Sequence, residues 1–537
     1  CTAGAAPALG AAAWPRGMSE AFVHLFEWSW ADVALECEQW LGPKGFRAVQ
    51  VSPPNEHIAG DEWWTRYQPV TYKLVSRSGD EKAFVDMVQR CKKVGVDVYA
   101  DAVINHIAGG SGASVAGSPY GNRSTPIYDP GDMHHDVGDT GHNCMVTNYT
   151  DKRNVQYCDL VGLPDLCTGC EKVQKTVAAY LSHLADVGVA GVRIDAAKHM
   201  DSQELGQLLS RVDPGMYRFM EVIASPGEGV SAEPYRELGQ VTEFAYGRAL
   251  EPAFLEGKLH SLDDIGASWG LMPSQSAVVF VDNHDTQRDD FFSPRLTHKT
   301  GRLYELANIF MLAHPYGYPK VMSSYYFESF DQGPPKTRVH TADGVACGGQ
   351  SSPVLSVDAA RQSGRPWVCE HRWTAVANMV AWRASAGSGG VTSFQAPGND
   401  TVAFCRGSAA CVALNRQNST WLARLRLSLP PGLYCDVAQS DDAAACPAVA
   451  VEADGTVRLE VPALGAVALH VGRLAAARDA EDGGSRGFPS HLFAILAIPV
   501  AFLLLALCLA FAAWRRRASK RGCTDTAPAA QASGSQV

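Results

Sequence analysis

Three acidic residues follow short apolar runs at widely separated points of the chain. Asp195 ends the segment GVRID, Glu221 lies in RFMEV, and Asp285 ends FVDNHD. Each has a His, Arg or Asn within a few residues, and each apolar run resembles a buried parallel strand. A single acidic residue in this setting is more typical of a helix N-cap, but three together indicate a site. Because the carboxyl ends of barrel strands meet on one face, these carboxylates predict the chemistry of a glycoside hydrolase.

Short apolar runs alternate with helix-patterned segments from residue 22 to residue 324. Helical periodicity is clear at residues 31–41, 81–94 and 171–187. The alternation predicts an α/β fold, a (β/α)₈ TIM barrel, with eight strands. The strand candidates are residues 23–26, 48–52, 96–104, 191–194, 217–222, 241–244, 278–283 and 320–324.

The alternation of strand and helix patterns stops after the third strand candidate, and this interruption predicts the domain organisation. Residues 107–166 are rich in Gly, Ser, Asp and Asn, so we expect a small inserted domain there. The catalytic barrel then covers residues 18–106 and 167–386. Residues 387–472 show short strands separated by turns, which predicts a C-terminal antiparallel β-sandwich, and residues 473–491 have the composition of a flexible stalk.

Residues 492–514 form an uncharged, apolar segment. As a helix it would be about 34 Å long, enough to cross a hydrocarbon core of about 30 Å. A buried core helix is the alternative, but basic residues follow in the tail, residues 515–537, and favour a transmembrane helix with a cytosolic tail. We expect a single-pass type I membrane protein with its catalytic domain extracellular or lumenal. Residues 1–17 resemble the end of a signal peptide.

The composition of the whole chain agrees with an extracellular or lumenal catalytic domain. The net charge is −10 and no basic run precedes residue 515, so nothing favours nucleic-acid binding, and we expect a monomer. Of the 15 cysteines, all but Cys508 and Cys523 precede the apolar segment, which suits an oxidising compartment. Four glycosylation sequons also fit a secretory route. Their asparagines are Asn122, Asn148, Asn399 and Asn418.

Four segments resemble the motif regions of the alpha-amylase family of glycoside hydrolases. They are DAVINH (101–106), GVRIDAAKH (191–199), MEVI (220–223) and FVDNHD (280–285), and the similarity extends over roughly residues 18–472. It is strongest toward animal-type, chloride-dependent alpha-amylases. The resemblance implies endo-acting, retaining hydrolysis of α-1,4-glucosidic bonds in starch, glycogen and maltooligosaccharides. It makes Asp195 the nucleophile, Glu221 the general acid/base and Asp285 a third carboxylate that binds sugar hydroxyls.

The resemblance also implies a set of substrate-binding residues. Aromatic rings would offer flat faces for sugar stacking, and histidines would bind hydroxyls. Taken singly, such residues are more often structural. The implied set is Trp63, Trp64, Tyr67, Gln68, His106, Arg193, Lys198, His199 and His284.

Two ions are implied by the same resemblance. The calcium ligands would be the side chains of Asn105 and Asp165 with the backbone carbonyls of Gln156 and His199, all hard oxygen donors. This site would tie the insert to the barrel, the alternative being that Asn105 only caps a turn. The chloride ligands would be Arg193, Asn283 and Lys320, with Lys in place of the commoner Arg. A carboxylate partner for Lys320, with no chloride, is the alternative.

Six disulfides are predicted. Family resemblance implies Cys37 with Cys91, Cys144 with Cys158, Cys347 with Cys369, and Cys435 with Cys446. Elimination and proximity add Cys405 with Cys411 and Cys167 with Cys170, leaving Cys1 as the odd cysteine.

The chain also departs from the family. The Gly-rich mobile loop after FVDNHD is replaced by residues 286–299, which contain two Asp and two Phe. A non-catalytic amylase-like ectodomain is one alternative, although such chains lose the carboxylates. A transglycosylase or an exo-acting α-glucosidase on the same scaffold stays open, because fold does not fix acceptor choice.

Overall fold

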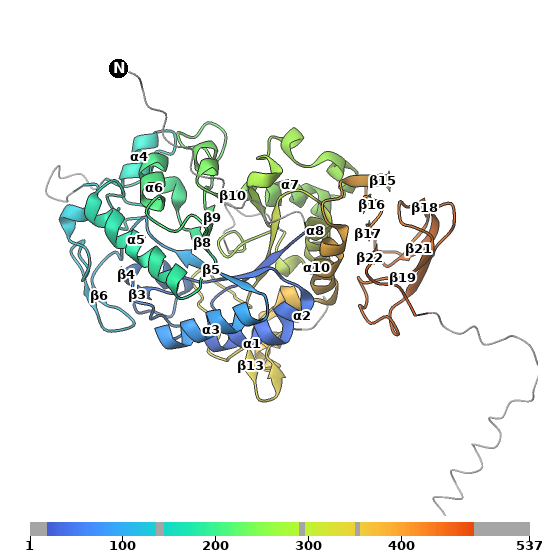
Figure 1. Ribbon diagram of the computed structural model, residues 1–537, viewed down its shortest axis with the longest axis horizontal. Helices are drawn as coiled ribbons and strands as arrows, with labels where there is room; N and C mark the ends of the chain where they lie inside the picture. The colour runs from blue at the N-terminus through green and yellow to red at the C-terminus, as the bar shows by residue number, and fades with distance from the viewer. Residues whose placement is uncertain (1–18, 136–143, 289–295, 349–354, 477–537) are drawn as a thin grey trace, which may run out of the picture. The chain divides into compact units, whose positions relative to one another are not determined.

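The computed structural model describes residues 19–135, 144–288, 296–348 and 355–476. Eight parallel strands close into a barrel in the order β1-β12-β11-β10-β9-β8-β5-β2, and Figure 1 shows helices ranged around them. The predicted TIM barrel is confirmed, with each strand at or within its predicted segment apart from one or two residues at the ends. The strands are β1 (Phe22–Leu25), β2 (Ala48–Val51), β5 (Asp97–Ala102), β8 (Gly191–Ile194), β9 (Tyr217–Met220), β10 (Gln240–Thr242), β11 (Ala277–Val279) and β12 (Tyr318–Ser323).

The positions of the helices are explained by their capping residues and by the apolar face that each turns toward the core. Helix α3 begins after Asp80, whose side chain accepts a hydrogen bond from the Ala83 amide at 2.9 Å, and it carries basic residues in its last turn. The first predicted helix continues through a π-helical turn and ends at Gly45, whose φ of 82° is left-handed. The main helices are α1 (Trp30–Glu36), α2 (Gly42–Lys44), α3 (Glu81–Lys93), α5 (Glu171–Asp186), α6 (Ser202–Leu209), α7 (Phe244–Leu255), α8 (Arg302–Ala313) and α10 (Thr374–Ala386).

Side chains fill the barrel in layers of opposite character. One layer is packed and mostly aromatic: Phe22, Ala48, Tyr99, Tyr217, Phe219, Val278 and Tyr318. Because side chains on a strand alternate, the residues two positions further along point inward as the next layer. That layer is largely polar: His24, Gln50, Asp101, Arg193, Glu221, Phe280 and Lys320. The sequence therefore places charged groups directly above an apolar floor.

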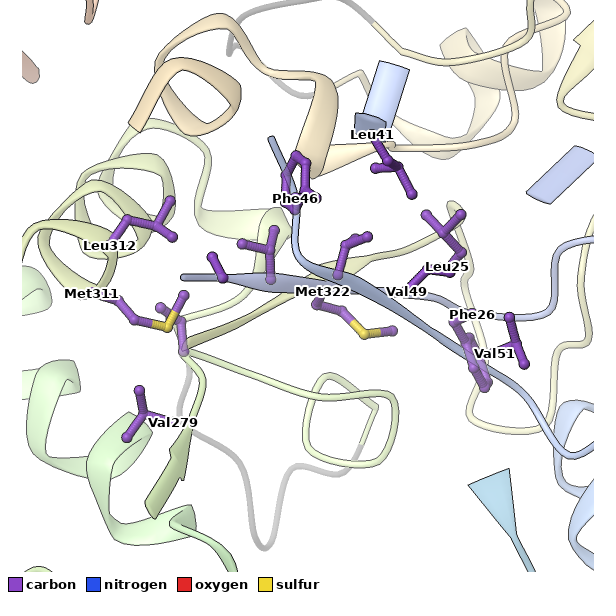
Figure 2. Close-up of a cluster of buried hydrophobic side chains, with 14 of the residues drawn as sticks. Leu25, Phe26, Leu41, Phe46, Val49, Val51, Val279, Met311, Leu312 and Met322 are labelled. Atoms are coloured by element: carbon purple, nitrogen blue, oxygen red, sulfur yellow. The ribbon is translucent and has the colours of Figure 1, made fainter. Parts of the chain in front are cut away.

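The outer face of the strands packs against the helices. Figure 2 shows Val49 and Val51 of β2, Val279 of β11, and Met311 and Leu312 of α8 in one buried cluster. Burial of these side chains between strand and helix holds the barrel wall in place.

The segment between β5 and α5 contains only short elements. Strands β6 (Gly112–Ala113) and β7 (Pro119–Tyr120) form a small hairpin, and α4 (Lys152–Tyr157) is a short helix. This agrees with the expected lack of helical period, while the domain limits at residues 107 and 166 remain a prediction.

The C-terminal region is a β-sandwich, as predicted. One antiparallel sheet has the order β15-β16-β17-β22 and the other the order β18-β21-β20-β19. Their facing side chains, including Cys405, Leu425 and Leu459, share one core. Trp382 of α10 attaches this region to the barrel, because its indole donates to the carbonyls of Cys411 and Leu469. The strands are β15 (Val391–Gly398), β16 (Thr401–Arg406), β17 (Ala410–Asn415), β18 (Trp421–Arg426), β19 (Gly432–Cys435), β20 (Ala448–Val451), β21 (Thr456–Val461) and β22 (Gly465–His470).

All six predicted disulfides are confirmed. They join Cys37 to Cys91, Cys144 to Cys158, Cys167 to Cys170, Cys347 to Cys369, Cys405 to Cys411, and Cys435 to Cys446. Cys1, Cys508 and Cys523 lie outside the described residues.

Within the described residues, no helix combines the length and the apolar character needed to cross a membrane. The predicted span at residues 492–514, its basic tail, the N-terminal segment 1–17 and nearly all of the predicted stalk lie outside those residues.

A buried ionic network connects α1 to distant parts of the chain. Both carboxylate oxygens of Glu36 are engaged: His340 and His371 each contact it at 2.8 Å, and Arg372 donates to it at 2.7 and 2.6 Å. Burial disfavours the charge, but these hydrogen bonds outweigh it and hold the pKa of Glu36 well below its usual range. Removing one partner of such a network leaves uncompensated charge inside the protein.

Glu36→Gln should therefore lower the free energy of unfolding by about 3–5 kcal/mol. The control lies close by in the chain: Glu38 pairs with Arg90 at 2.6 Å on the surface, so Glu38→Gln should cost no more than about 1 kcal/mol. Equilibrium unfolding in denaturant measures both values. An equal loss of unfolding free energy in the two variants would contradict a stabilising role for the buried network.

Candidate active site

Arg193 joins the catalytic candidates at the carboxyl edge of the barrel. Its Nη1 donates to Asp101 Oδ1 at 2.7 Å and to Asp195 Oδ1 at 2.8 Å, and its Nη2 contacts Glu221 Oε1. Asp101 is the last residue but one of β5, Asp195 follows β8 and Glu221 follows β9, so adjacent strands bring them together. The structure thus places Asp195 and Glu221 on one shared cation, within reach of a common ligand.

The backbone between the two carboxylates is held in a rare conformation. Ala196 has a φ of 47°, in the left-handed region that non-glycine residues seldom adopt. This turn directs the Ala196 amide at Glu221 Oε2, which accepts its hydrogen bond at 2.8 Å. Strain of this kind is typical of functional sites, and here it fixes one oxygen of Glu221 while Arg193 holds the other.

Asp285 is positioned by its neighbours in the FVDNHD segment. Asn283 Oδ1 accepts hydrogen bonds from the amides of Asp285 and Thr286 at 3.1 and 2.8 Å, and Asn283 Nδ2 donates to Asp285 Oδ2 at 3.3 Å. The opposite oxygen, Asp285 Oδ1, lies 3.4 Å from His284 Nε2. Desolvation by the surrounding protein, helped by the negative charge of Glu221, raises the pKa of Asp285 to about 7.

The pKa of Asp195 is affected by opposing causes. Burial raises it, the Arg193 guanidinium opposes that rise, and the negative charges of Glu221 and Asp101 add to it. The net result is a pKa of Asp195 well above its usual range, with the Arg193 contact opposing the rise, so the role of Arg193 in favouring the ionised nucleophile stays a prediction.

The aromatic candidates surround His284. Tyr67 stacks on the His284 ring at 5.2 Å, and Trp63 meets the same ring edge-on at 5.6 Å. Tyr67 also donates its hydroxyl to Asp101 Oδ2 at 3.0 Å, and its carbonyl accepts a hydrogen bond from His106 Nε2 at 2.8 Å. Of the ring candidates only Trp64 is half-exposed, whereas Trp63 and Tyr67 are largely buried.

The remaining candidates lie around this centre, each with its own partner. Gln68 Oε1 accepts a hydrogen bond from the Gly109 amide at 3.2 Å. Lys198 Nζ donates to the Ile223 carbonyl and to Glu228 Oε2, both at 2.6 Å. His199 Nδ1 bonds the Val155 carbonyl at 2.9 Å, so it belongs to the contact between the insert and the barrel.

Sequence reasoning missed several residues of the site. Asp101 lies in the quoted DAVINH motif but received no role, although an acid beside Arg193 in the strand register was a usable signal. Arg288 had no signal at all. It is buried, and its guanidinium lies 4.0 Å from the Phe327 ring centroid and 5.6 Å from that of Trp63.

The predicted calcium ligands include two unpartnered buried oxygens. Among the described residues, Asn105 Oδ1 and Asp165 Oδ1 find no hydrogen-bond partner. A β-bridge between His106 and Asp165 and the hydrogen bond from the Leu166 amide to the Asn105 carbonyl bring the two segments together. Oxygen atoms left open inside a protein are costly unless a cation or water engages them, so this donor set fits a hard divalent cation.

The predicted chloride ligands include a buried cation, Lys320, that has no acidic partner among the described residues. Lys320 is 1% exposed, and within the described residues no carboxylate reaches its Nζ, which lies 4.6 Å from the Phe280 ring centroid. Burial, together with the charge of Arg193, lowers the pKa of Lys320 to about 8. The alternative in which Lys320 pairs with a carboxylate is not found in the described part of the chain, and a cationic, buried cradle fits a small anion.

Comparison with known proteins agrees with this geometry. The alpha amylase catalytic domain model matches residues 45–208, and the alpha amylase C-terminal all-beta domain model matches residues 392–472. The alpha-amylase of Thermomonospora curvata is 45% identical over 492 residues, covering 88% of this chain and 76% of that protein. The alpha-amylase of Tribolium castaneum is 42% identical over 441 residues, covering 77% and 85%.

Solved structures point the same way. Alpha-amylase I of Eisenia fetida superposes with a TM-score of 0.76 at 33% identity, over 85% of this chain and 98% of that one. A gamma-CGTase of Bacillus clarkii superposes with a TM-score of 0.57 at 16% identity, which shows a shared fold only.

A parallel barrel that gathers three carboxylates around one arginine at its carboxyl edge defines a glycoside hydrolase. The similarity over most of the chain makes the assignment narrower: the chain belongs to the alpha-amylase family.

Proposed function

We propose that this protein is an endo-acting alpha-amylase that hydrolyses α-1,4-glucosidic bonds of starch, glycogen and maltooligosaccharides with retention of configuration. The observation that carries the proposal is Arg193, which holds Asp195 and Glu221 at one point of the barrel edge. A retaining glycosidase needs two carboxylates close together with different duties.

The contacts of Asp195 and Glu221 support a separate catalytic role for each. Asp195, whose anionic form Arg193 favours, attacks the anomeric carbon while Glu221 gives its proton to the departing glycosidic oxygen. Water then enters, Glu221 takes a proton from it as the water oxygen bonds to the anomeric carbon, and the bond from the sugar to Asp195 breaks. Asp285, His284 and His106 would bind hydroxyls of the distorted sugar, a role supported by their place beside Tyr67 and Trp63.

Other activities on the same scaffold differ in how the covalent intermediate is resolved. A transglycosylase transfers the sugar to another glucan, and an exo-acting glucosidase accepts only a chain end. The gamma-CGTase shares only the fold with this chain and so adds no support for transfer. The intact carboxylate set argues against a non-catalytic ectodomain.

Two ions complete the proposal. Calcium would be held by Asn105, Asp165 and the carbonyls of Gln156 and His199, and it would fasten the insert to the barrel. Chloride would lie among Arg193, Asn283 and Lys320, where it would offset the charge of the two cations.

We further propose a lumenal or extracellular catalytic domain on a single transmembrane helix, residues 492–514. The six disulfides of the described region suit an oxidising compartment. The four sequon asparagines are all exposed, as glycan attachment requires.

Asp195→Asn and Glu221→Gln should each lower kcat by about 100-fold to 10,000-fold without loss of fold, because each removes one half of the double displacement. Proton NMR of fresh product should show the α-anomer first, and circular dichroism should show unchanged secondary structure. A β-anomer, or an active Asp195→Asn protein, would overturn the assignment of roles.

Chelation of calcium should lower the melting temperature and the activity together. A ligand at 100 times its Kd stabilises the folded state by about 2.7 kcal/mol, so its removal costs that amount. In Asp165→Ala the chelator should change the melting temperature far less, because one ligand is already gone. A wild-type melting temperature that does not respond to chelator would argue against the site.

Chloride should raise activity, and its effect should weaken as the pH rises through about 8. Lys320 has a pKa lowered to about 8, so it is charged below that pH and loses its charge above it, and the anion site then loses one cation. Steady-state rates at several chloride concentrations across the pH range measure this. Lys320→Gln should show little chloride dependence at any pH. Wild-type rates that are the same with and without chloride at every pH would show that Lys320 has a structural role only.

A further inference from the structure

One disulfide of the chain differs from the other five in its loop and in its exposure. Cys167 and Cys170 are three residues apart, whereas the other described disulfides join cysteines that lie 6 to 54 residues apart. Both cysteines of this pair are half-buried, and each of the other five disulfides has at least one buried cysteine. Because a disulfide stabilises a fold less when its loop is short, and because exposed disulfides exchange with thiols, this pair suits exchange better than a structural role.

The pair forms a C-x-x-C motif at the start of a long helix. Cys170 directly precedes α5, and its side chain makes no capping hydrogen bond there. The Cys170 amide donates to the Cys167 carbonyl at 2.9 Å, which closes the turn. The N-terminal end of a helix favours negative charge, and cysteines of C-x-x-C motifs at such ends give reactive thiolates. Cys170 is therefore well placed to leave as a thiolate when the disulfide is attacked.

The same turn begins two residues after the proposed calcium ligand Asp165. Backbone hydrogen bonds fasten the stretch between them: the Leu166 amide donates to the Asn105 carbonyl at 2.9 Å, and the Cys167 amide donates to the Asp132 carbonyl at 2.8 Å. The disulfide thus lies between this ligand-bearing stretch and α5. It restrains the path by which the chain leaves the calcium site.

Side chains also connect the turn to Asp165. Thr168 Oγ1 donates to Glu204 Oε2 at 2.7 Å, and an added Cβ at Gly169 would come within 2.8 Å of Glu204 Oε1, so the turn packs closely on that carboxylate. Glu204 belongs to α6, which packs beside α5 (Figure 1). His134 Nε2 lies 3.6 Å from Glu204 Oε2, and His134 Nδ1 contacts Asp165 Oδ2 at 2.5 Å. Opening the disulfide would release the turn and disturb both its backbone and its side-chain connection to Asp165.

We propose that the Cys167–Cys170 disulfide is a site of thiol–disulfide exchange with a dithiol partner, and that its reduction weakens the calcium site. A thiolate of the dithiol attacks Cys167 Sγ, the bond between Cys167 and Cys170 breaks, and Cys170 leaves as a thiolate. The second thiolate of the partner then attacks the partner's own sulfur in the mixed disulfide and releases Cys167. The chain gains two electrons, the two protons of the dithiol end on Cys167 and Cys170, and the partner becomes a disulfide.

Graded reduction of the full oxidised chain with dithiothreitol tests the exchange. Thiols that are free at the start are blocked first, and thiols exposed by reduction are then alkylated and mapped by mass spectrometry. Cys167 and Cys170 should be labelled at concentrations that leave the other described disulfides intact. Cys405 and Cys411 are the matched control, because they close the next shortest loop but are both buried in the sandwich. Labelling of both pairs at the same concentration would overturn the exchange site.

The effect on calcium rests on the calcium site of the proposed function, and calorimetric titration with calcium alone measures it. Cys167→Ala with Cys170→Ala removes the bond without adding a group, and it should bind calcium about tenfold more weakly, as expected for the loss of an outer contact of a ligand. Cys405→Ala with Cys411→Ala should keep the wild-type affinity. A thermal melt checks that each variant is folded, and the wild-type chain before and after mild reduction carries the test if one is not.

An unchanged calcium affinity in the variant that lacks Cys167 and Cys170 would overturn the link between the disulfide and calcium. An oxidised wild-type chain that binds no calcium would refute the calcium site of the proposed function and this link with it. The labelling pattern decides the exchange independently, since it requires neither calcium nor hydrolysis.

Discussion

A single buried charge organises the centre of this barrel. Arg193 is 1% exposed and touches Asp101, Asp195 and Glu221. Neither the cation nor the carboxylates would be tolerated there alone, since unpaired charge inside a protein costs several kcal/mol per ion. The site is therefore built as one unit, in which each acid secures the arginine and the arginine secures each acid. Asp195 and Glu221 differ in what else touches them, since the Ala196 amide donates to Glu221.

The mostly aromatic layer of side chains beneath Arg193 leaves room for Arg193 and its three acidic partners. Gly191, the inward residue before Arg193, has no side chain, and a Cβ there would come within 2.9 Å of Tyr217 Cβ. Tyr217 fills the space instead and packs on Tyr99 at 4.8 Å. This aromatic floor excludes water and keeps the polar layer at a fixed height. Above it, His24 and Gln50 keep buried polar atoms without partners, which marks the barrel centre as a place where ions or water complete the bonding.

Much of this could be read from the sequence, for a physical reason. Barrel strands are short apolar runs, and the groups at their ends are forced to one face, so Asp195, Glu221 and Asp285 were predictable together. The disulfide partners were predictable too, because most follow the family's spacing. Arg288 and the ionic network of Glu36 were not. Glu36 meets His371 across 335 residues of sequence, and nothing local in either segment records that contact.

Acidic residues of α1 contact a segment that lies about 300 residues further along the chain. Asp32 accepts hydrogen bonds from Arg338 at 2.8 Å and from the amides of Val339 and His340 at 3.3 and 3.2 Å, and Glu36 holds the His340 side chain. These contacts fix the far end of residues 330–340, whose near end receives the indoles of Trp63 and Trp64. The stacking residues are thus placed by acids on α1, on the outside of the barrel, through a segment that has little regular structure of its own. A change of length or anchoring in that segment would move Trp63 and Trp64 while leaving the carboxylates and Arg193 where they are, so the two parts of the candidate site are positioned independently of each other.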